Sequence, residues 1–149
     1  MDGESLFLSK EDFEEGRVLL INKEVGWTSF DVVKKTKNLI KSRFKIKKIK
    51  VGHAGTLDPL ATGLLIICTG KLTKEISKIQ DQVKTYTGEV TLGATTPSFD
   101  LETDVDQNFD TTKITRNHIK EVAKKFIGQI EQRPPAYSAI KINGERLYK

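Results

Sequence analysis

A glycine-rich segment at residues 52–63, GHAGTLDPLATG, constrains this chain more than any other part of the sequence. Its three glycines permit backbone angles that other residues rarely adopt, and its proline removes a hydrogen-bond donor. The proline also keeps the preceding residue, Asp58, out of the helical region of conformational space. The segment therefore predicts a stiff, extended turn that holds one carboxylate just before an apolar run at 64–68.

Asp58 in this loop has two interpretations. Aspartate and proline are ordinary turn residues, and an aspartate before proline often only forms a turn with its own backbone. Alternatively, a loop on a rigid scaffold is a common position for a group that acts on a substrate. Composition alone favours the first interpretation.

The whole segment resembles a signature of the bacterial tRNA pseudouridine synthases that act on uridine 55 of the tRNA T loop. Three other blocks resemble the same family in the same order: residues 16–33, which include Lys23 and GWTSFDVV, residues 84–93, which begin with KTY, and residues 132–148, which include QRPPAYSAIK. Four blocks in one order are far more specific than a single motif. The chain is therefore identified as a member of this family.

The chain also departs from the family pattern. Glu24 stands where the family usually has proline after its lysine, and TPSFD at 96–100 replaces a more usual Thr-Asp-Thr-x-Asp pattern. The family's catalytic domain continues past the point that corresponds to Lys149, with a segment that completes the pocket and often with a small RNA-binding module. We therefore expect residues 1–149 to be the N-terminal portion of a pseudouridine synthase catalytic domain.

Hydrophobic spacing predicts the helices and strands. Helical periodicity follows a cap at Thr28 or Ser29 as far as about Arg43, and it recurs at 71–80 and 115–127. Runs that predict strands lie at 18–22, 64–69, 84–92, 129–132 and 138–142. We expect the first of these strands to be central in the sheet. Asn143-Gly144 predicts a tight hairpin turn.

These elements predict an α/β protein of the α+β kind. Strands and helices do not alternate strictly, and the Asn-Gly turn favours antiparallel pairing over a doubly wound nucleotide-binding fold. The chain length of 149 residues fits one domain. The resemblance implies the pseudouridine synthase fold, a mixed and largely antiparallel sheet flanked by helices, with the active site in a central cleft.

Positive charge is concentrated in one part of the chain. The formal net charge is +5, and six cations at 41–50 are interleaved with apolar residues just before the Asp58 loop. Such a run is usually a solvated face, but beside a candidate active site it also suits a polyanion, because neutralising phosphates releases counterions. On charge alone the two interpretations are equally favoured.

The chain carries one cysteine, Cys68, which lies in an apolar run and cannot form a disulfide within the chain. Residues 1–15 lack the apolar core of a secretory signal, and no apolar run approaches the ~20 residues needed to cross a bilayer. We therefore expect a cytoplasmic protein that does not contact membranes. One cysteine and two histidines provide no spacing of a structural zinc site, so we expect no bound metal.

The chemistry that the resemblance implies is an isomerisation. It breaks the bond between N1 of uracil and C1′ of ribose, turns the base and rejoins it through C5. No redox change occurs, so we expect no cofactor. The resemblance assigns catalysis to Asp58, in keeping with the use of carboxylates near anomeric carbons. Attack on C1′, attack on the base and removal of a ribose proton all remain open.

A uridine in a folded loop must leave its stack before an enzyme can reach C1′. The resemblance implies that His53 enters the vacated position in the RNA and that Tyr86 stacks on the flipped base. It also implies further substrate-binding residues, namely Lys23, Gly55, Thr56, Leu57 and Lys84. Without the resemblance, His53 is more simply a loop histidine bonded to its own backbone, and Tyr86 is a core aromatic.

The partner that the resemblance implies is the T-arm of tRNA, bound by a monomer. The basic run and the missing part of the family's domain favour an alternative, a fragment that binds RNA without turning it over. A third possibility is a phosphate-binding loop, because Gly70-Lys71 follow an apolar strand. It fails because Leu72 stands where that motif requires serine or threonine.

Overall fold

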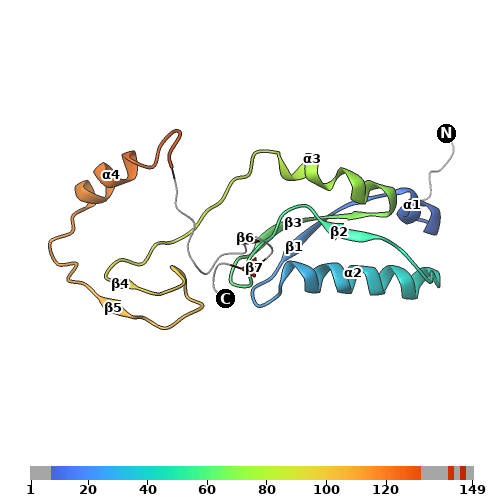
Figure 1. Ribbon diagram of the computed structural model, residues 1–149, viewed down its shortest axis with the longest axis horizontal. Coiled ribbons are helices and arrows are strands. Elements are labelled where there is room, and N and C mark those ends of the chain that lie inside the picture. The colour runs from blue at the N-terminus through green and yellow to red at the C-terminus, as the bar shows by residue number, and fades with distance from the viewer. Residues whose placement is uncertain (1–7, 132–140, 143–144, 147–149) are drawn as a thin grey trace. The chain divides into compact units, whose positions relative to one another are not determined.

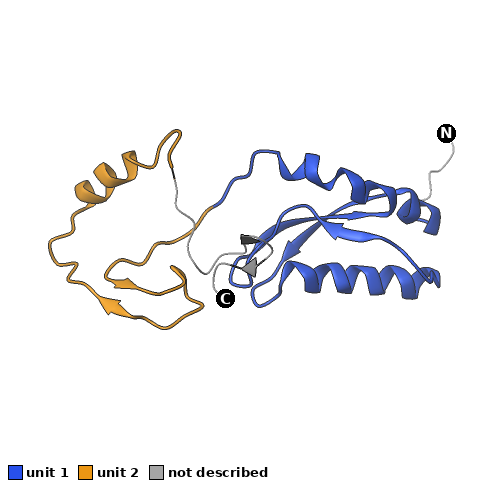
Figure 2. Ribbon diagram, viewed as in Figure 1, with its two compact units in different colours: residues 1–86 blue, residues 87–149 orange. Residues whose placement is uncertain are grey.

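A computed structural model describes residues 8–131, 141–142 and 145–146 (Figure 1). The chain length predicts one domain, whereas the structure divides into two compact units, residues 1–86 and 87–149 (Figure 2). The first unit contains the Asp58 loop and is built around a three-stranded sheet. Each unit is described by itself.

The sheet of the first unit is antiparallel and comprises β1 (Val18–Lys23), β3 (Gly63–Thr69) and β2 (Val51–His53), in that order. The strands at 18–22 and 64–69 are therefore confirmed, but the expectation that the first is central is wrong for the described sheet. β3 is the middle strand because it pairs on both edges, and its residues 67–69 are fully buried. β1 has one exposed face, where Leu20 is 68% exposed.

Helix α2 (Ser29–Phe44) covers one face of this sheet (Figure 1). Its Val32 and Val33 pack against Leu65 and Ile67 of β3. A capping box starts the helix: the Thr28 hydroxyl accepts a hydrogen bond from the Asp31 backbone N–H, and the Asp31 carboxylate accepts one from the Thr28 backbone N–H. The predicted start and end of this helix are thus confirmed.

The far end of β3 is closed by short helices. Helix α1 (Lys10–Glu15) begins with a Ser9–Asp12 capping box, and β3 leads into a 3₁₀ helix, η1 (Gly70–Glu75), followed by α3 (Ile76–Gln80). The helix predicted at 71–80 is therefore present, with its first half wound more tightly. Gly70 has a φ of +53° and lies directly against the backbone carbonyls of α1.

The second unit has little regular structure among its described residues. It contains the antiparallel pair β4 (Ala94–Thr95) and β5 (Gln107–Asn108), helix α4 (Arg116–Lys124), and the antiparallel pair β6 (Lys141–Ile142) and β7 (Glu145–Arg146). Ile142 pairs with Glu145, as a two-residue hairpin connection requires. Residues 132–140 and 143–144, which include the Pro-Pro segment and the Asn-Gly turn, lie outside the described residues.

Two predicted strands and one predicted helix end between residues 84 and 131 are wrong. Residues 84–92 form no strand, and 129–131, the described part of a predicted strand, form none either. Alternating polarity stabilises a strand only when a neighbour pairs with it and covers one face. Val90 of the first segment is instead 86% exposed. The helix predicted to reach Ile127 ends at Lys124.

The α+β fold class is confirmed, since every strand pair in the described residues is antiparallel and helices flank the sheet. Among the helices that the structure describes, none combines the length and apolar character that a membrane span requires.

The close approach at Gly70 makes a testable prediction about stability. A Cβ on residue 70 would overlap the carbonyl oxygens of Phe13 and Glu14, so Gly70→Ala forces β3 away from α1. Gly26 also has a positive φ, +83°, but open space surrounds its Cβ position. Both variants carry backbone strain of about 1 kcal/mol, and only Gly70→Ala adds overpacking of about 1–3 kcal/mol.

Urea unfolding measures this difference directly. We expect Gly70→Ala to lose clearly more free energy of unfolding than Gly26→Ala. Equal losses would mean that α1 yields to β3 without cost, contrary to the packing described here.

Candidate active site

The backbone on both sides of Asp58 is tied to the start of α2. The Leu57 N–H donates to Ser29 Oγ at 2.9 Å, and the same hydroxyl donates to the Leu57 carbonyl at 3.1 Å. On the other side, the Gly26 N–H donates to the Pro59 carbonyl at 2.8 Å. The Asp58 carbonyl itself accepts from the Ala61 N–H at 3.0 Å, which closes the turn. The position of Asp58 is therefore set by its neighbours.

Lys23 adds a third tie from beneath the loop. Its side chain is 1% exposed, and Nζ donates to the carbonyls of Glu24 at 3.0 Å, Trp27 at 2.7 Å and Pro59 at 3.5 Å. A lysine ammonium has three donors, so these three acceptors use all of them. A buried charge is costly unless it is hydrogen-bonded. The need to keep these three hydrogen bonds therefore restricts the conformations that the loop can adopt.

The Asp58 side chain itself faces solvent. Within the residues that the structure describes, its carboxylate makes no hydrogen bond and no ion pair, whereas the backbone around it is held at three points. A carboxylate with a fixed origin and free oxygens is suited to act on a bound molecule.

His53 is the last residue of β2 and is half-buried. Its Nδ1 lies 2.8 Å from the Gly55 carbonyl, so the ring donates there and its Nε2 is left as the second functional atom. The backbone-bonded interpretation is therefore correct as a description of the ring. It is also compatible with a role for Nε2, because such a bond orients the imidazole.

The three residues before Asp58 differ in environment. Gly55 has a φ of +114° with open space at its Cβ position, and Thr56 is exposed. Leu57 is partly buried against the cluster formed by Val32, Val33, Leu65 and Ile67. The loop thus presents Gly55 and Thr56 outward and anchors itself in the core through Leu57.

In the described part of the chain, no hydrogen bond or ion pair joins Tyr86 or Lys84 to this loop. Tyr86 is 70% exposed, so the interpretation of Tyr86 as a core aromatic is wrong. Lys84 Nζ donates to the carbonyls of Gln80 and Gln82 at the end of α3, the latter at 2.9 Å. A cation at this position binds carbonyls that the helix end leaves unpaired.

A strongly positive stretch begins inside α2. Residues 29–50 contain nine lysines and arginines and one acidic residue, Asp31. None of the five ion pairs among the described residues involves any of these nine cations. Hydrogen bonds from Thr28, first through its side chain and then through its backbone, hold the pKa of Asp31 below its usual value. The Gly70 N–H donates to the Lys50 carbonyl at 2.9 Å, so this stretch ends at the far end of β3, and only its start in the first turn of α2 is tied to the Asp58 loop. The expectation that the run at 41–50 lies beside that loop is therefore wrong for its last residues.

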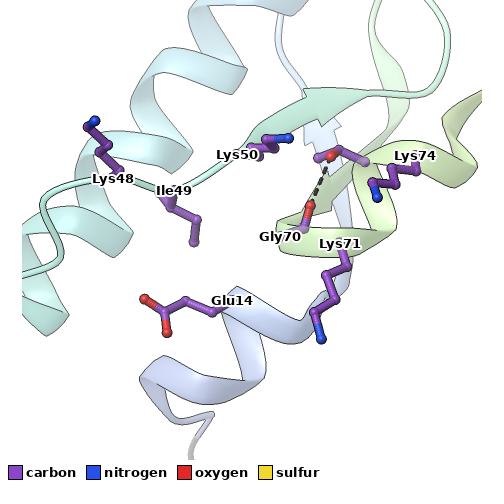
Figure 3. Close-up of a pocket in the computed structure, with 8 residues that line it drawn as sticks. Glu14, Lys48, Ile49, Lys50, Gly70, Lys71 and Lys74 are labelled. Atoms are coloured by element: carbon purple, nitrogen blue, oxygen red, sulfur yellow. Dashed lines mark hydrogen bonds between the residues drawn. The ribbon is translucent and has the colours of Figure 1, made fainter.

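A hollow of about 300 Å³ at the other end of β3 is a separate feature (Figure 3). β3 starts beside the Asp58 loop and ends at the hollow, roughly 20 Å away for a strand of this length. Figure 3 shows Lys48 and Lys71 pointing in different directions, and Lys71 pairs with Glu15 at 2.6 Å. The hollow is lined by Glu14, Lys48, Ile49, Lys50, Gly70, Lys71, Thr73 and Lys74.

Cys68 is fully buried, and burial raises the pKa of its thiol, which disfavours a role as nucleophile. In the described ranges, no three His, Cys, Asp or Glu side chains gather as metal ligands do.

The sequence patterns did not identify two contributors to the site. Ser29 was considered only as a helix cap, yet it holds Leu57. Trp27 was seen only as part of a motif, yet its carbonyl binds Lys23. The Ser29–Leu57 contact joins residues 28 positions apart, so no local spacing signals it. The Lys23–Trp27 contact is local, but it depends on burial of the Lys23 side chain, which the sequence pattern does not indicate.

Comparison with known proteins places this loop in a family. A family model described as "TruB family pseudouridylate synthase (N terminal domain)" matches residues 41–149. Proteins named tRNA pseudouridine synthase B from Flavobacterium johnsoniae and Bacteroides fragilis are 55% and 53% identical to the chain, over 143 and 137 residues. The matches cover 95% and 92% of this chain but 62% and 59% of the relatives.

A more distant relative of the same name, from Chlorobium chlorochromatii, is 48% identical over 134 residues, which is 90% of this chain and 52% of the relative. The chain thus spans between half and two thirds of the length of these relatives. The family match itself covers most of the chain and includes the whole Asp58 loop. The chain belongs to the TruB family of pseudouridylate synthases.

Proposed function

We propose that this chain is the N-terminal portion of the catalytic domain of a tRNA pseudouridine synthase that isomerises a T-loop uridine, with Asp58 as its catalytic carboxylate. The observation that carries the proposal is the contrast at Asp58, where the backbone is tied on both sides and the carboxylate has no hydrogen-bond or ion-pair partner among the residues that the structure describes. The family membership and the relatives' name support the reaction class.

The reaction needs a carboxylate close to C1′ or to the base. Asp58 serves as nucleophile or as base, and the bond from N1 to C1′ is replaced by one from C5 to C1′. The isomerisation requires neither redox cofactor nor metal. The reaction takes place on tRNA in the cytoplasm, and the enzyme acts as a monomer that binds the T-arm.

The uridine is reached by base flipping, which costs a few kcal/mol of unstacking energy. His53 compensates for it by entering the vacated position, with Nδ1 held by Gly55 and Nε2 directed to the RNA. Tyr86, whose ring is exposed, stacks on the flipped base. Gly55 and Thr56 line the approach, and Lys84 lies at its edge.

Lys23 has a different part in this proposal from direct substrate contact. Its three donors are occupied by carbonyls of the chain, including that of the residue after Asp58. It acts as a positioning residue that fixes the turn from which the carboxylate projects.

A second candidate function is RNA binding without turnover. It is favoured by the positive charge at 29–50, which has no ion-pair partner among the described residues. The two functions predict similar affinity for tRNA and differ only in chemistry.

Tritium release from a tRNA transcript with 5-tritiated uridine tests the main proposal. We expect release by the wild-type chain and a loss of at least about 100-fold in Asp58→Ala, because the variant removes the reacting carboxylate. Asp81→Ala, at another exposed aspartate, is the matched control and should keep full activity. Equal release by Asp58→Ala and wild type would refute the role of Asp58. Tight tRNA binding without any release by the wild type would establish the second function.

His53 is tested by two substitutions. His53→Asn keeps a donor near the position of Nδ1, and with it the bond to Gly55, but lacks Nε2; His53→Ala lacks both. We expect both to weaken tRNA binding by about tenfold, the loss of roughly one good contact. Binding by His53→Asn that equals wild type, with only His53→Ala impaired, would assign His53 a purely structural role. Fluorescence anisotropy of labelled tRNA measures both.

Lys23→Met tests the tie beneath the loop. The variant keeps the length of the side chain but removes the hydrogen bonds of the ammonium to three carbonyls, of which, in the described chain, only that of Pro59 keeps another donor, the Gly26 N–H. We therefore expect a loss of about 2–4 kcal/mol in unfolding free energy. Lys37→Met, at an exposed position of α2, should lose less than about 0.5 kcal/mol. Urea unfolding compares the two, and similar losses would contradict the structural role of the Lys23 ammonium.

A further inference from the structure

A second hollow, of about 360 Å³, opens beside the Asp58 loop. One wall is the turn at Gly26 and Trp27, and the other is a face of α2 formed by Asp31, Lys34, Lys35 and Asn38. The four helix residues are spaced i, i+3, i+4 and i+7, which places them on one side of the helix. The hollow thus lies between the turn at Gly26 and Trp27 and one side of α2.

This hollow is adjacent to the candidate active site. The Gly26 N–H donates to the Pro59 carbonyl at 2.8 Å, and Lys23 Nζ binds the carbonyls of both Trp27 and Pro59. One wall of the hollow is thus hydrogen-bonded to the residue that follows Asp58. The turn at Gly26 and Trp27 therefore connects the hollow to the Asp58 loop.

The lining combines a partly exposed aromatic ring with positive charge. Trp27 is 40% exposed although its backbone is held from below by Lys23. Lys34 and Lys35 are exposed and take part in none of the ion pairs of the described chain. Asp31 is the one acid in the lining, and its carboxylate is engaged with the Thr28 N–H at 3.0 Å and with the Thr28 hydroxyl. These bonds leave the charge of Asp31 in place, and after the Thr28 hydrogen bonds Lys34 also lowers the pKa of Asp31. Two lysines against one carboxylate still give the lining a net positive charge.

These groups are those that bind an unpaired nucleotide. An exposed indole offers a face on which a base stacks, lysines neutralise the flanking phosphates, and an asparagine amide reaches donors and acceptors on a base edge. The volume lies in the range of pockets that hold small organic groups. An acidic peptide would satisfy the lysines but would leave the indole face without a planar partner.

We propose that this hollow binds an unpaired nucleotide of the RNA that neighbours the reacting uridine, with its base stacked on Trp27 and its phosphate held by Lys34 and Lys35. The proposal rests on the proposed function and adds a substrate contact outside the Asp58 loop. It makes Trp27 a residue that positions the RNA while the neighbouring uridine leaves the stack.

The chain itself supplies the probe, because Trp27 is its single tryptophan. Tryptophan fluorescence of the Asp58→Ala chain is titrated with a tRNA T-arm stem-loop, while anisotropy of a label on the same RNA reports binding. We expect the fluorescence to be quenched along the binding curve, since a stacked base quenches an indole. Binding with unchanged Trp27 fluorescence would overturn the inference and leave the proposed function intact. Absence of binding would overturn both.

Two double variants separate the hollow from general electrostatics. Lys34→Ala/Lys35→Ala removes the proposed phosphate contacts, and Lys47→Ala/Lys48→Ala removes the same charge from exposed residues outside the hollow. We expect the first to lower affinity about tenfold more than the second and to reduce the quench at saturating RNA. Equal effects of the two would overturn the inference. Equal quenching by polyglutamate would instead identify an acidic peptide as the ligand.

Trp27→Ala measures the stacking itself. Loss of one stacked base should weaken stem-loop binding about tenfold or more, whereas Trp27→Phe should restore most of it. Wild-type affinity in Trp27→Ala would contradict the proposal.

Discussion

The buried ammonium of Lys23 is the contact on which the geometry around Asp58 depends. Lys23 is the last residue of β1, and its side chain lies under the turn before α2. Its ammonium binds the carbonyls of Glu24, Trp27 and Pro59, so it joins the strand, the turn and the Asp58 loop. A buried lysine is stable only while its donors are hydrogen-bonded. The carbonyls of the turn must therefore stay where the ammonium can reach them. Ser29 and Gly26 then hold the residues on either side of Asp58.

This arrangement separates rigidity from reactivity. The backbone of the loop is held by hydrogen bonds and by the packing of Leu57 into the core, while the Asp58 carboxylate and the indole of Trp27 remain accessible. Positive charge without carboxylate partners in the described structure runs along α2, from the helix start tied to this loop to the segment at the far end of β3. A polyanion can therefore be attracted over a wide surface and positioned by a few fixed groups.

Features that depend on nearby residues could be predicted. The predicted helix starts at Thr28 and Thr115 are correct because a capping box is complete within four residues. The strand at 84–92 was predicted from alternation alone and is absent, because a strand needs a paired neighbour and Tyr86 has no such cover. The prediction that β1 is the central strand is wrong for the same reason, since the order of strands depends on pairing between segments that are distant in sequence.

The sequence by itself determined the family and the class of fold and indicated Asp58 as the candidate carboxylate, because the order of four blocks and the glycine-rich loop are properties of the chain as written. Only the tertiary structure decided how Asp58 is held, what Lys23 does and where Trp27 lies. The hold on Asp58 depends on hydrogen bonds between residues 28 to 36 positions apart. The contacts of Lys23 with Trp27 and Pro59 depend on burial that turns a lysine from a solvated cation into a structural one. Such contacts produce no periodic pattern in a sequence, because periodicity reflects the geometry of single helices and strands. Any residue of suitable chemistry can form the contact once folding brings it near.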